Sequence, residues 1–112
     1  MEKIRTGTFD NLSELTTLEL MCNFIKVVEE NLFKYNANLV QLDLSNNEIE
    51  RIEENTFKNL INLVELILSY NHIEILHENL FINNSKLREL RLTSNRIKAL
   101  GENTFSHLMD LD

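Results

Sequence analysis

The chain has 112 residues, of which 43% are hydrophobic, and it carries a formal net charge of −7 at pH 7. This length fits at most one domain, and the hydrophobic fraction suits a packed core rather than a disordered chain. The acidic balance argues against nucleic acid as a partner, because surfaces that bind nucleic acid are basic. No apolar run is long enough to span a bilayer, and the first residues do not read as a signal peptide.

Apolar residues recur along the chain at a fixed step of 24 residues. Residues 1–14 match the back half of a unit, complete units follow at 15–38, 39–62, 63–86 and 87–110, and residues 111–112 open another. A repeat of this length indicates a solenoid, in which each unit forms one coil and neighbouring coils share a core. The recurring positions are Leu15, Leu39, Leu63, Leu87 and Leu111; Leu18, Leu42, Leu66 and Leu90; Leu20, Leu44, Leu68 and Leu92; Ile25, Ile49, Ile73 and Ile97; Val28, Ile52, Leu76 and Leu100; and Phe9, Phe33, Phe57, Phe81 and Phe105.

Within one unit, residues 41–45 alternate between polar and apolar side chains, which predicts a short strand with one buried side. Strands that follow one another coil by coil must pair in parallel. The chain is expected to leave the sheet at Ile49 and to return along the opposite wall at Phe57. That return segment is expected to be helical or irregular, with Asn55 or Thr56 as a cap. The predicted fold is an α/β, right-handed solenoid.

An asparagine recurs in every unit between two apolar positions, as Asn23, Asn47, Asn71 and Asn95. A side-chain amide both donates and accepts hydrogen bonds. At the end of a strand it can pair with backbone groups of its own coil and of the next, so we expect a structural ladder of asparagines. The alternative is four asparagines in surface turns.

The unit follows L-x-x-L-x-L-x-x-N-x-I-x-x-I-x-x-x-x-F-x-x-L-x-x, which resembles the leucine-rich repeat over the whole chain. Its length and its phenylalanine resemble the "typical" subclass, which is common in extracellular proteins such as Toll-like receptors, small proteoglycans and adhesion proteins. The resemblance implies a curved solenoid whose parallel sheet lines the concave face. It also implies that another macromolecule binds there.

The chain departs from this family at its ends. Extracellular members usually carry cysteine-rich caps, whereas this chain has one cysteine, Cys22, and begins and stops in mid-unit. Terminal coils without polar caps would expose apolar edges. We therefore expect either a fragment of a longer array or self-association through uncapped ends.

A second pattern alternates between successive units. One position reads Thr8, Leu32, Thr56, Leu80 and Thr104, and the position four residues later reads Leu12, Asn36, Leu60, Asn84 and Leu108. One hypothesis is that the return segments alternate in backbone conformation. The other is that a two-unit block was duplicated, with no structural meaning.

Function is expected on the outward side of the sheet, because these positions vary between units while the core positions hardly do. Acidic residues outnumber the single arginine there, so a basic or mixed-charge protein is the expected partner. The outward residues are Thr17, Glu19, Met21, Gln41, Asp43, Ser45, Glu65, Ile67, Ser69, Glu89, Arg91 and Thr93, and Cys22, Asn46, Tyr70 and Ser94 lie beside the strand ends.

One spot on this face combines an apolar centre with charged and aromatic neighbours. Ile67 is apolar where water is expected, Asp43 and Arg91 are expected to flank it on the adjacent strands, and Tyr70 follows. That composition is typical of a binding hot spot. The alternative is an isolated strand isoleucine, and single exposed apolar residues are normal. The predicted contact residues are Glu19, Gln41, Asp43, Glu65, Ile67, Tyr70, Glu89 and Arg91.

Neither a cofactor, a metal nor a catalytic role is predicted. His72, His77 and His107 lack a regular ligand spacing. The acids Glu29, Glu30, Glu53, Glu54, Glu78 and Glu102 are expected to form a solvated rim, and an open sheet gives carboxylates no closed pocket.

Two N-glycosylation patterns, at Asn11 and Asn83, occupy the same position of the unit, on the wall opposite the sheet. Glycans there would leave the sheet free. Together with the family resemblance, they favour a non-catalytic protein-binding module of a secreted or cell-surface receptor or adhesion protein. The alternative is an intracellular scaffold in the cytoplasm.

Overall fold

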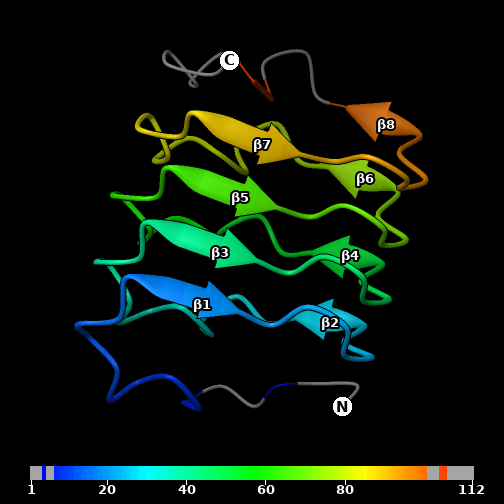
Figure 1. Ribbon diagram of the computed structural model, residues 1–112. Coiled ribbons are helices and arrows are strands. Elements are labelled where there is room, and N and C mark those ends of the chain that lie inside the picture. The colour runs from blue at the N-terminus through cyan, green and yellow to red at the C-terminus, as the bar shows by residue number, and fades with distance from the viewer. Residues whose placement is uncertain (1–3, 5–6, 101–103, 106–112) are drawn as a thin grey trace.

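The computed structural model describes residues 4, 7–100, 104 and 105, and they wind as a right-handed stack of coils (Figure 1). Each complete coil adds one strand to a common wall. The register joins residues one repeat apart, as in the pairing of Leu18 with Leu42 and of Leu42 with Leu66. The strands β1 (Thr17–Glu19), β3 (Gln41–Asp43), β5 (Glu65–Ile67) and β7 (Glu89–Arg91) lie parallel in that order. The parallel sheet and the solenoid predicted from the repeat are thus confirmed.

Backbone pairing continues beyond the assigned strands to a residue with left-handed backbone. The Tyr70 N–H, for example, donates to the Thr93 carbonyl oxygen at 2.8 Å. This residue recurs once per coil, with φ of 61° at Cys22, 56° at Asn46, 58° at Tyr70 and 58° at Ser94. Residues other than glycine and asparagine rarely adopt the left-handed backbone region. The bend at the strand end is therefore under conformational strain at Cys22, Tyr70 and Ser94.

Short second strands lie across the coil from the main sheet, and the sequence pattern did not predict them. Each contains two residues, which is too short for a periodicity to reveal. They are β2 (Val27–Val28), which pairs in parallel with β4 (Arg51–Ile52), and β6 (Ile75–Leu76), which pairs in parallel with β8 (Ala99–Leu100).

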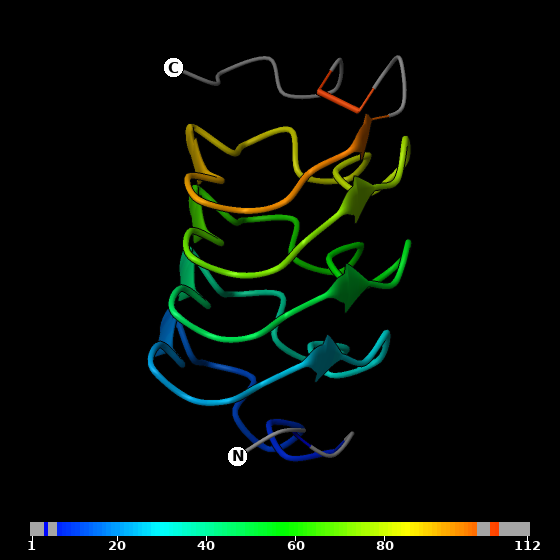
Figure 2. The ribbon, with the colours of Figure 1, turned by 90° about the vertical axis from the view of Figure 1, so that its right-hand side faces the viewer.

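One continuous core fills the space between the walls, and the leucines of β3 and β5 are fully buried in it. The phenylalanines of the return wall form a column, in which neighbouring ring centroids lie 6.2 to 6.4 Å apart. Neighbouring parallel strands lie only about 4.8 Å apart. Because each coil is thicker at its return wall than at its sheet, the stack curves with the sheet on the inner, concave side (Figure 2).

The described return segments contain consecutive turns and no helix. In the third coil, the N–H groups of Thr56 and Leu60 donate to carbonyl oxygens three residues earlier. The expected cap is therefore wrong. The Asn55 side chain donates instead to Glu30 of the preceding coil at 2.8 Å, and the buried Thr56 hydroxyl has no hydrogen-bond partner among the described residues.

The return segments do not alternate in backbone conformation as hypothesised. The turn hydrogen bonds around Phe57 recur one repeat later around Phe81. The side chains do differ. Asn84 is fully buried and donates to the carbonyl oxygens of Phe57 and Leu60, both at 3.0 Å, and Asn36 contacts the first coil in the same way. The alternation therefore places a buried amide of every second coil on the backbone of the coil before it.

Candidate functional site

The repeated asparagines lie where the strands end and hold successive coils together. Asn47 donates to the carbonyl oxygens of Leu44 in its own coil and Leu20 in the preceding coil, both at 3.0 Å, and accepts from the Ile25 N–H at 3.3 Å. Asn71 and Asn95 make equivalent bonds, and Asn23 bonds within its own coil. The amide reaches back to the preceding coil, so the expected direction toward the next coil is wrong.

Exposure on the concave face depends on the number of neighbouring strands. Glu19 of β1 and Arg91 of β7 are exposed, because each strand has one neighbour in the described sheet. On the central strands, Gln41, Glu65 and Ile67 are half-buried. The leucines that these strands turn inward vary in the same way: those of β3 and β5 are buried, and those of β1 and β7 are partly exposed.

Asp43 does not present a free carboxylate to solvent, contrary to expectation. Its side chain is 8% exposed and accepts a hydrogen bond from the Ser45 N–H at 2.9 Å. Ser45 and Ser69 are also buried rather than outward-facing and accessible. These residues belong to the two central coils of the sheet, which have a neighbouring strand on each side.

A polar row crosses three strands at one register. The Gln41 amide donates to the Glu65 carboxylate at 3.1 Å, and Glu65 pairs in register with Glu89. Burial, and then the neighbouring Glu89 carboxylate, raise the pKa of Glu65. A hydrogen bond from Arg91, 2.8 Å away along the same strand, lowers the pKa of Glu89. Glu89 is therefore well paired by Arg91, whereas the negative charge of Glu65 is poorly compensated.

Ile67 and Tyr70 form the apolar part of the concave site. Ile67 pairs in register with Asp43 on one side and Arg91 on the other, so these residues flank it. Tyr70 is 56% exposed at the end of the same strand, and its left-handed backbone fixes where the ring leaves the chain. An exposed aromatic ring beside a half-buried isoleucine offers apolar contact area inside a polar rim.

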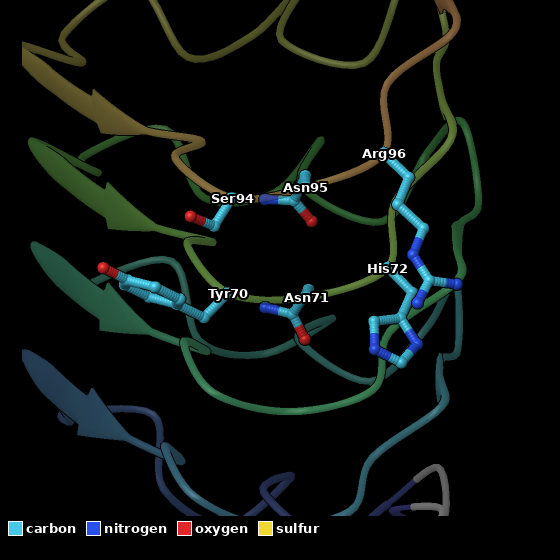
Figure 3. Close-up of a pocket in the computed structure, with 6 residues that line it drawn as sticks. All are labelled: Tyr70, Asn71, His72, Ser94, Asn95 and Arg96. Carbon is cyan, nitrogen blue, oxygen red and sulfur yellow. The ribbon is translucent and has the colours of Figure 1, made fainter.

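A hollow of about 400 Å³ lies next to this site, beside the strand ends of the last two complete coils (Figure 3). Tyr70 and Ser94 line one side, His72 and Arg96 the other, and Asn71 and Asn95 lie between them. The sequence pattern did not predict this hollow. The signal that could have revealed it is the unit position that reads Phe24, Glu48, His72 and Arg96, where two basic residues occur in consecutive coils.

The remaining predicted residues are spread over the surface. Asn11 and Asn83 are exposed on the return wall, where the Asn83 amide donates to the Lys58 carbonyl oxygen at 3.0 Å. Cys22 is an exposed free thiol. The part of the chain that the structure describes contains no group of three or more potential metal ligands and no helix that could cross a membrane. Glu102, His107, Leu108 and residues 111–112 lie outside the described residues.

The acids of the outer rim are partly engaged. Glu54 accepts from Asn79 at 3.3 Å, as Glu30 does from Asn55, and Glu53 pairs with Arg51 at 3.4 Å. These contacts run along the outside of the coils and are largely exposed, so each contributes little to stability.

Solved structures with the same fold include a chain of a complex described as a molecular hub in development and innate immunity. A chain in the glycosylated Drosophila Toll–Spatzle complex matches with a TM-score of 0.83 and 28% identity, over 86% of this chain and 13% of that chain. A chain of the TLR13–ssRNA13 complex matches with a TM-score of 0.82 and 31% identity, over 96% of this chain and 16% of that chain. The leucine-rich repeat domain of APL1B matches with a TM-score of 0.90 and 24% identity, over 99% of this chain and 32% of that chain. The chain thus spans at most about a third of these proteins.

A comparison with curated protein sequences gave no significant match. The family model described as leucine rich repeat matches in four overlapping stretches, residues 1–49, 13–73, 37–97 and 61–112, which together cover the chain. Both the periodicity of the sequence and the coil geometry agree with this match. The chain belongs to the leucine-rich repeat family.

Proposed function

We propose that this chain is a non-catalytic module that binds a protein partner on its concave sheet. The observation that carries the proposal is the composition of that face around Ile67. The half-buried Ile67 lies between Asp43 and Arg91, with Gln41 and Glu65 one outward position earlier on the sheet. Tyr70 is exposed beyond the end of the same strand. Apolar and aromatic anchors inside a polar rim are the arrangement that contributes most to protein–protein affinity.

The electrostatics favour a partner with basic side chains opposite the row of acids. Glu65 of the central strand β5 lies in register with Glu89 of the edge strand β7, and Arg91 pairs with Glu89. A lysine or arginine of the partner would compensate the charge of Glu65, which its own neighbours leave poorly paired. The same acids would repel a polyanion, so we propose a protein rather than nucleic acid, although a complex of the similar TLR13 contains RNA.

The proposed context is a secreted or cell-surface receptor or adhesion protein. The similarity to chains of the Toll and TLR13 complexes supports it, as does the position of Asn11 and Asn83 on the return wall, away from the sheet. The test is the intact mass of the chain after secretion from a eukaryotic cell, before and after enzymatic deglycosylation. A mass loss at both asparagines is expected; a folded, secreted product with neither site occupied would favour the cytoplasmic alternative.

The binding proposal is tested with two matched isoleucine substitutions. A partner is first selected from a display library of secreted protein domains, and its affinity is then measured for Ile67→Arg and Ile75→Arg. Ile67 lies in β5 on the concave face, whereas Ile75 is an exposed residue of β6 across the coil. Loss of at least ~2 kcal/mol of binding free energy is expected for Ile67→Arg alone. Equal affinity of the two variants would reject the concave face as the binding site.

Mass measured across a range of protein concentrations separates this proposal from self-association. A monomer at every concentration is expected. A mass that rises with concentration would favour assembly through the partly exposed inner leucines of β1 and β7 instead.

A further inference from the structure

The hollow beside the strand ends is already shaped before any ligand enters. Its floor consists of Asn71 and Asn95, and their amide groups are engaged by the backbone. The Asn71 oxygen accepts from the Ile49 N–H at 3.1 Å, and the Asn95 oxygen accepts from the Ile73 N–H at 3.1 Å. Because the hydrogen bonds that stack the coils also fix this floor, little ordering cost remains for a ligand.

The side chains around the floor carry hydrogen-bond donors. Figure 3 shows the Arg96 guanidinium extending along one side toward the His72 imidazole, with the Ser94 and Tyr70 side chains on the other side. An arginine presents donors in a planar fork that matches a carboxylate. The hollow is thus a cluster of donors on a chain whose net charge is −7.

Glu74, an acid near the hollow, does not neutralise this cluster. Glu74 lies one repeat from Lys98, whose ammonium pairs with it at 2.9 Å. The hydrogen bond from Lys98 is the main cause of the lowered pKa of Glu74, and the charge of Arg96 contributes only weakly. Since Lys98 satisfies Glu74, the guanidinium of Arg96 is left able to pair with an acid from outside.

We propose that this hollow binds a carboxylate side chain of an acidic protein segment, with Arg96 as its ion-pair partner and the neighbouring His72 imidazole as a further donor. The inference rests on the proposed function, because it assigns the acid to the partner on the adjacent concave face. That partner would then carry mixed charge, with a basic group over Glu65 and an acidic group over Arg96. Tyr70 borders both places and joins them into one surface.

A single carboxylate fits this position better than a phosphate backbone does. Glu65 and Glu89 lie on the neighbouring sheet, and Glu48 stands one repeat before His72. A chain of phosphates that extended beyond the hollow would meet these acids, whereas one carboxylate on a protein segment need not.

The experiment uses a blocked tetraglutamate peptide as the probe, with tetraglutamine as the uncharged control. Chemical shifts of the ¹⁵N-labelled protein are followed during titration at low salt. The largest shifts are expected at residues 70–72 and 94–96 for the charged peptide only. Arg96→Gln is expected to weaken its affinity by about tenfold. Arg88→Gln removes the same charge from an exposed position of β7's coil outside the hollow and is expected to change the affinity less than about twofold.

Several results would overturn this assignment. Equal weakening by both variants would show general electrostatic attraction, and shifts centred elsewhere or the absence of shifts would show that the hollow takes no carboxylate. A short single-stranded RNA that binds the same residues more tightly than the peptide would assign the hollow to phosphate instead. None of these results touches the concave-face proposal, because that proposal fails only if Ile67→Arg leaves partner affinity unchanged.

Discussion

The side-chain amide of Asn71 donates a hydrogen bond to the carbonyl oxygen of Leu44, one coil earlier, at 3.0 Å. The same amide donates to Leu68 in its own coil, and its oxygen accepts from Ile49. One polar side chain therefore satisfies buried backbone groups of two coils, at the point where both strands end.

Replacement of Asn71 by alanine should lower the free energy of unfolding by about 1–3 kcal/mol, because these backbone groups would be buried without partners. Urea denaturation followed by circular dichroism measures the change. The control is Asn59→Ala, at a half-buried asparagine on the return wall, where a change within about 0.5 kcal/mol is expected. Similar losses in the two variants would mean that Asn71 is an ordinary surface residue.

Replacement of Cys22 by asparagine should raise stability by about 0.5–1 kcal/mol. Cys22 has left-handed backbone with a φ of 61°, and the equivalent residue of the next coil is already asparagine, Asn46. Asparagine tolerates this region better than other side chains. Cys22→Ala is the matched control, since it removes the thiol without easing the backbone. If the two variants have the same melting temperature, the strain at this bend is negligible.

Truncation of Phe57 should destabilise the fold far more than truncation of Phe105. The Phe57 ring is fully buried, with Phe33 at 6.4 Å and Phe81 at 6.3 Å, whereas Phe105 is 38% exposed. Phe57→Ala should cost about 3–5 kcal/mol through lost burial and the cavity that remains. Phe105→Ala should cost less than half of that, by the same denaturation assay. Equal costs would show that the column does not behave as one packed core.

The substitution Glu65→Gln should stabilise the chain at neutral pH and have little effect in acid. The pKa of Glu65 is raised in the fold, so its folded form favours the proton more than the unfolded chain does. The stability that this provides is present below the ordinary value of 4.5 and is lost as pH rises through the folded pKa. Glutamine imitates the protonated form at every pH.

Melting temperatures of this variant and of Glu50→Gln, an exposed control, are compared at pH 7 and well below pH 4.5. If the gain in melting temperature of Glu65→Gln persisted in acid, or if Glu50→Gln gave the same gain, the ionisation of Glu65 would not be its cause.

The fold followed from the sequence because the repeat specifies it many times. Once Leu18, Leu42, Leu66 and Leu90 are aligned at one step, the strands can pair in only one register, and the structure has that register. The return wall was harder. The spacing of Phe57 and Leu60 suits one helical turn, but three-residue turn bonds formed instead. A short segment carries too little periodicity to separate the two.

The details of the site depended on contacts that one unit does not encode. Asp43 was expected to face solvent by strand alternation, yet the Ser45 N–H and the crowding of a central strand cover it. The hollow arises between coils, where Tyr70 and His72 meet Ser94 and Arg96 one repeat later. Such a site becomes visible in the sequence only when equivalent positions of successive units are compared as a surface.

The most direct test of binding at the concave face is oxidative footprinting of the two tyrosines with and without a bound partner. Tyr70 lies beside the sheet and is 56% exposed, while Tyr35 lies on the return wall and is 49% exposed, so the two start from similar accessibility. Mass spectrometry after a hydroxyl-radical pulse gives the oxidation of each ring. A partner bound to the concave face is expected to protect Tyr70 and to leave Tyr35 unchanged. Protection of Tyr35 with Tyr70 unchanged would contradict it and place the partner on the return wall.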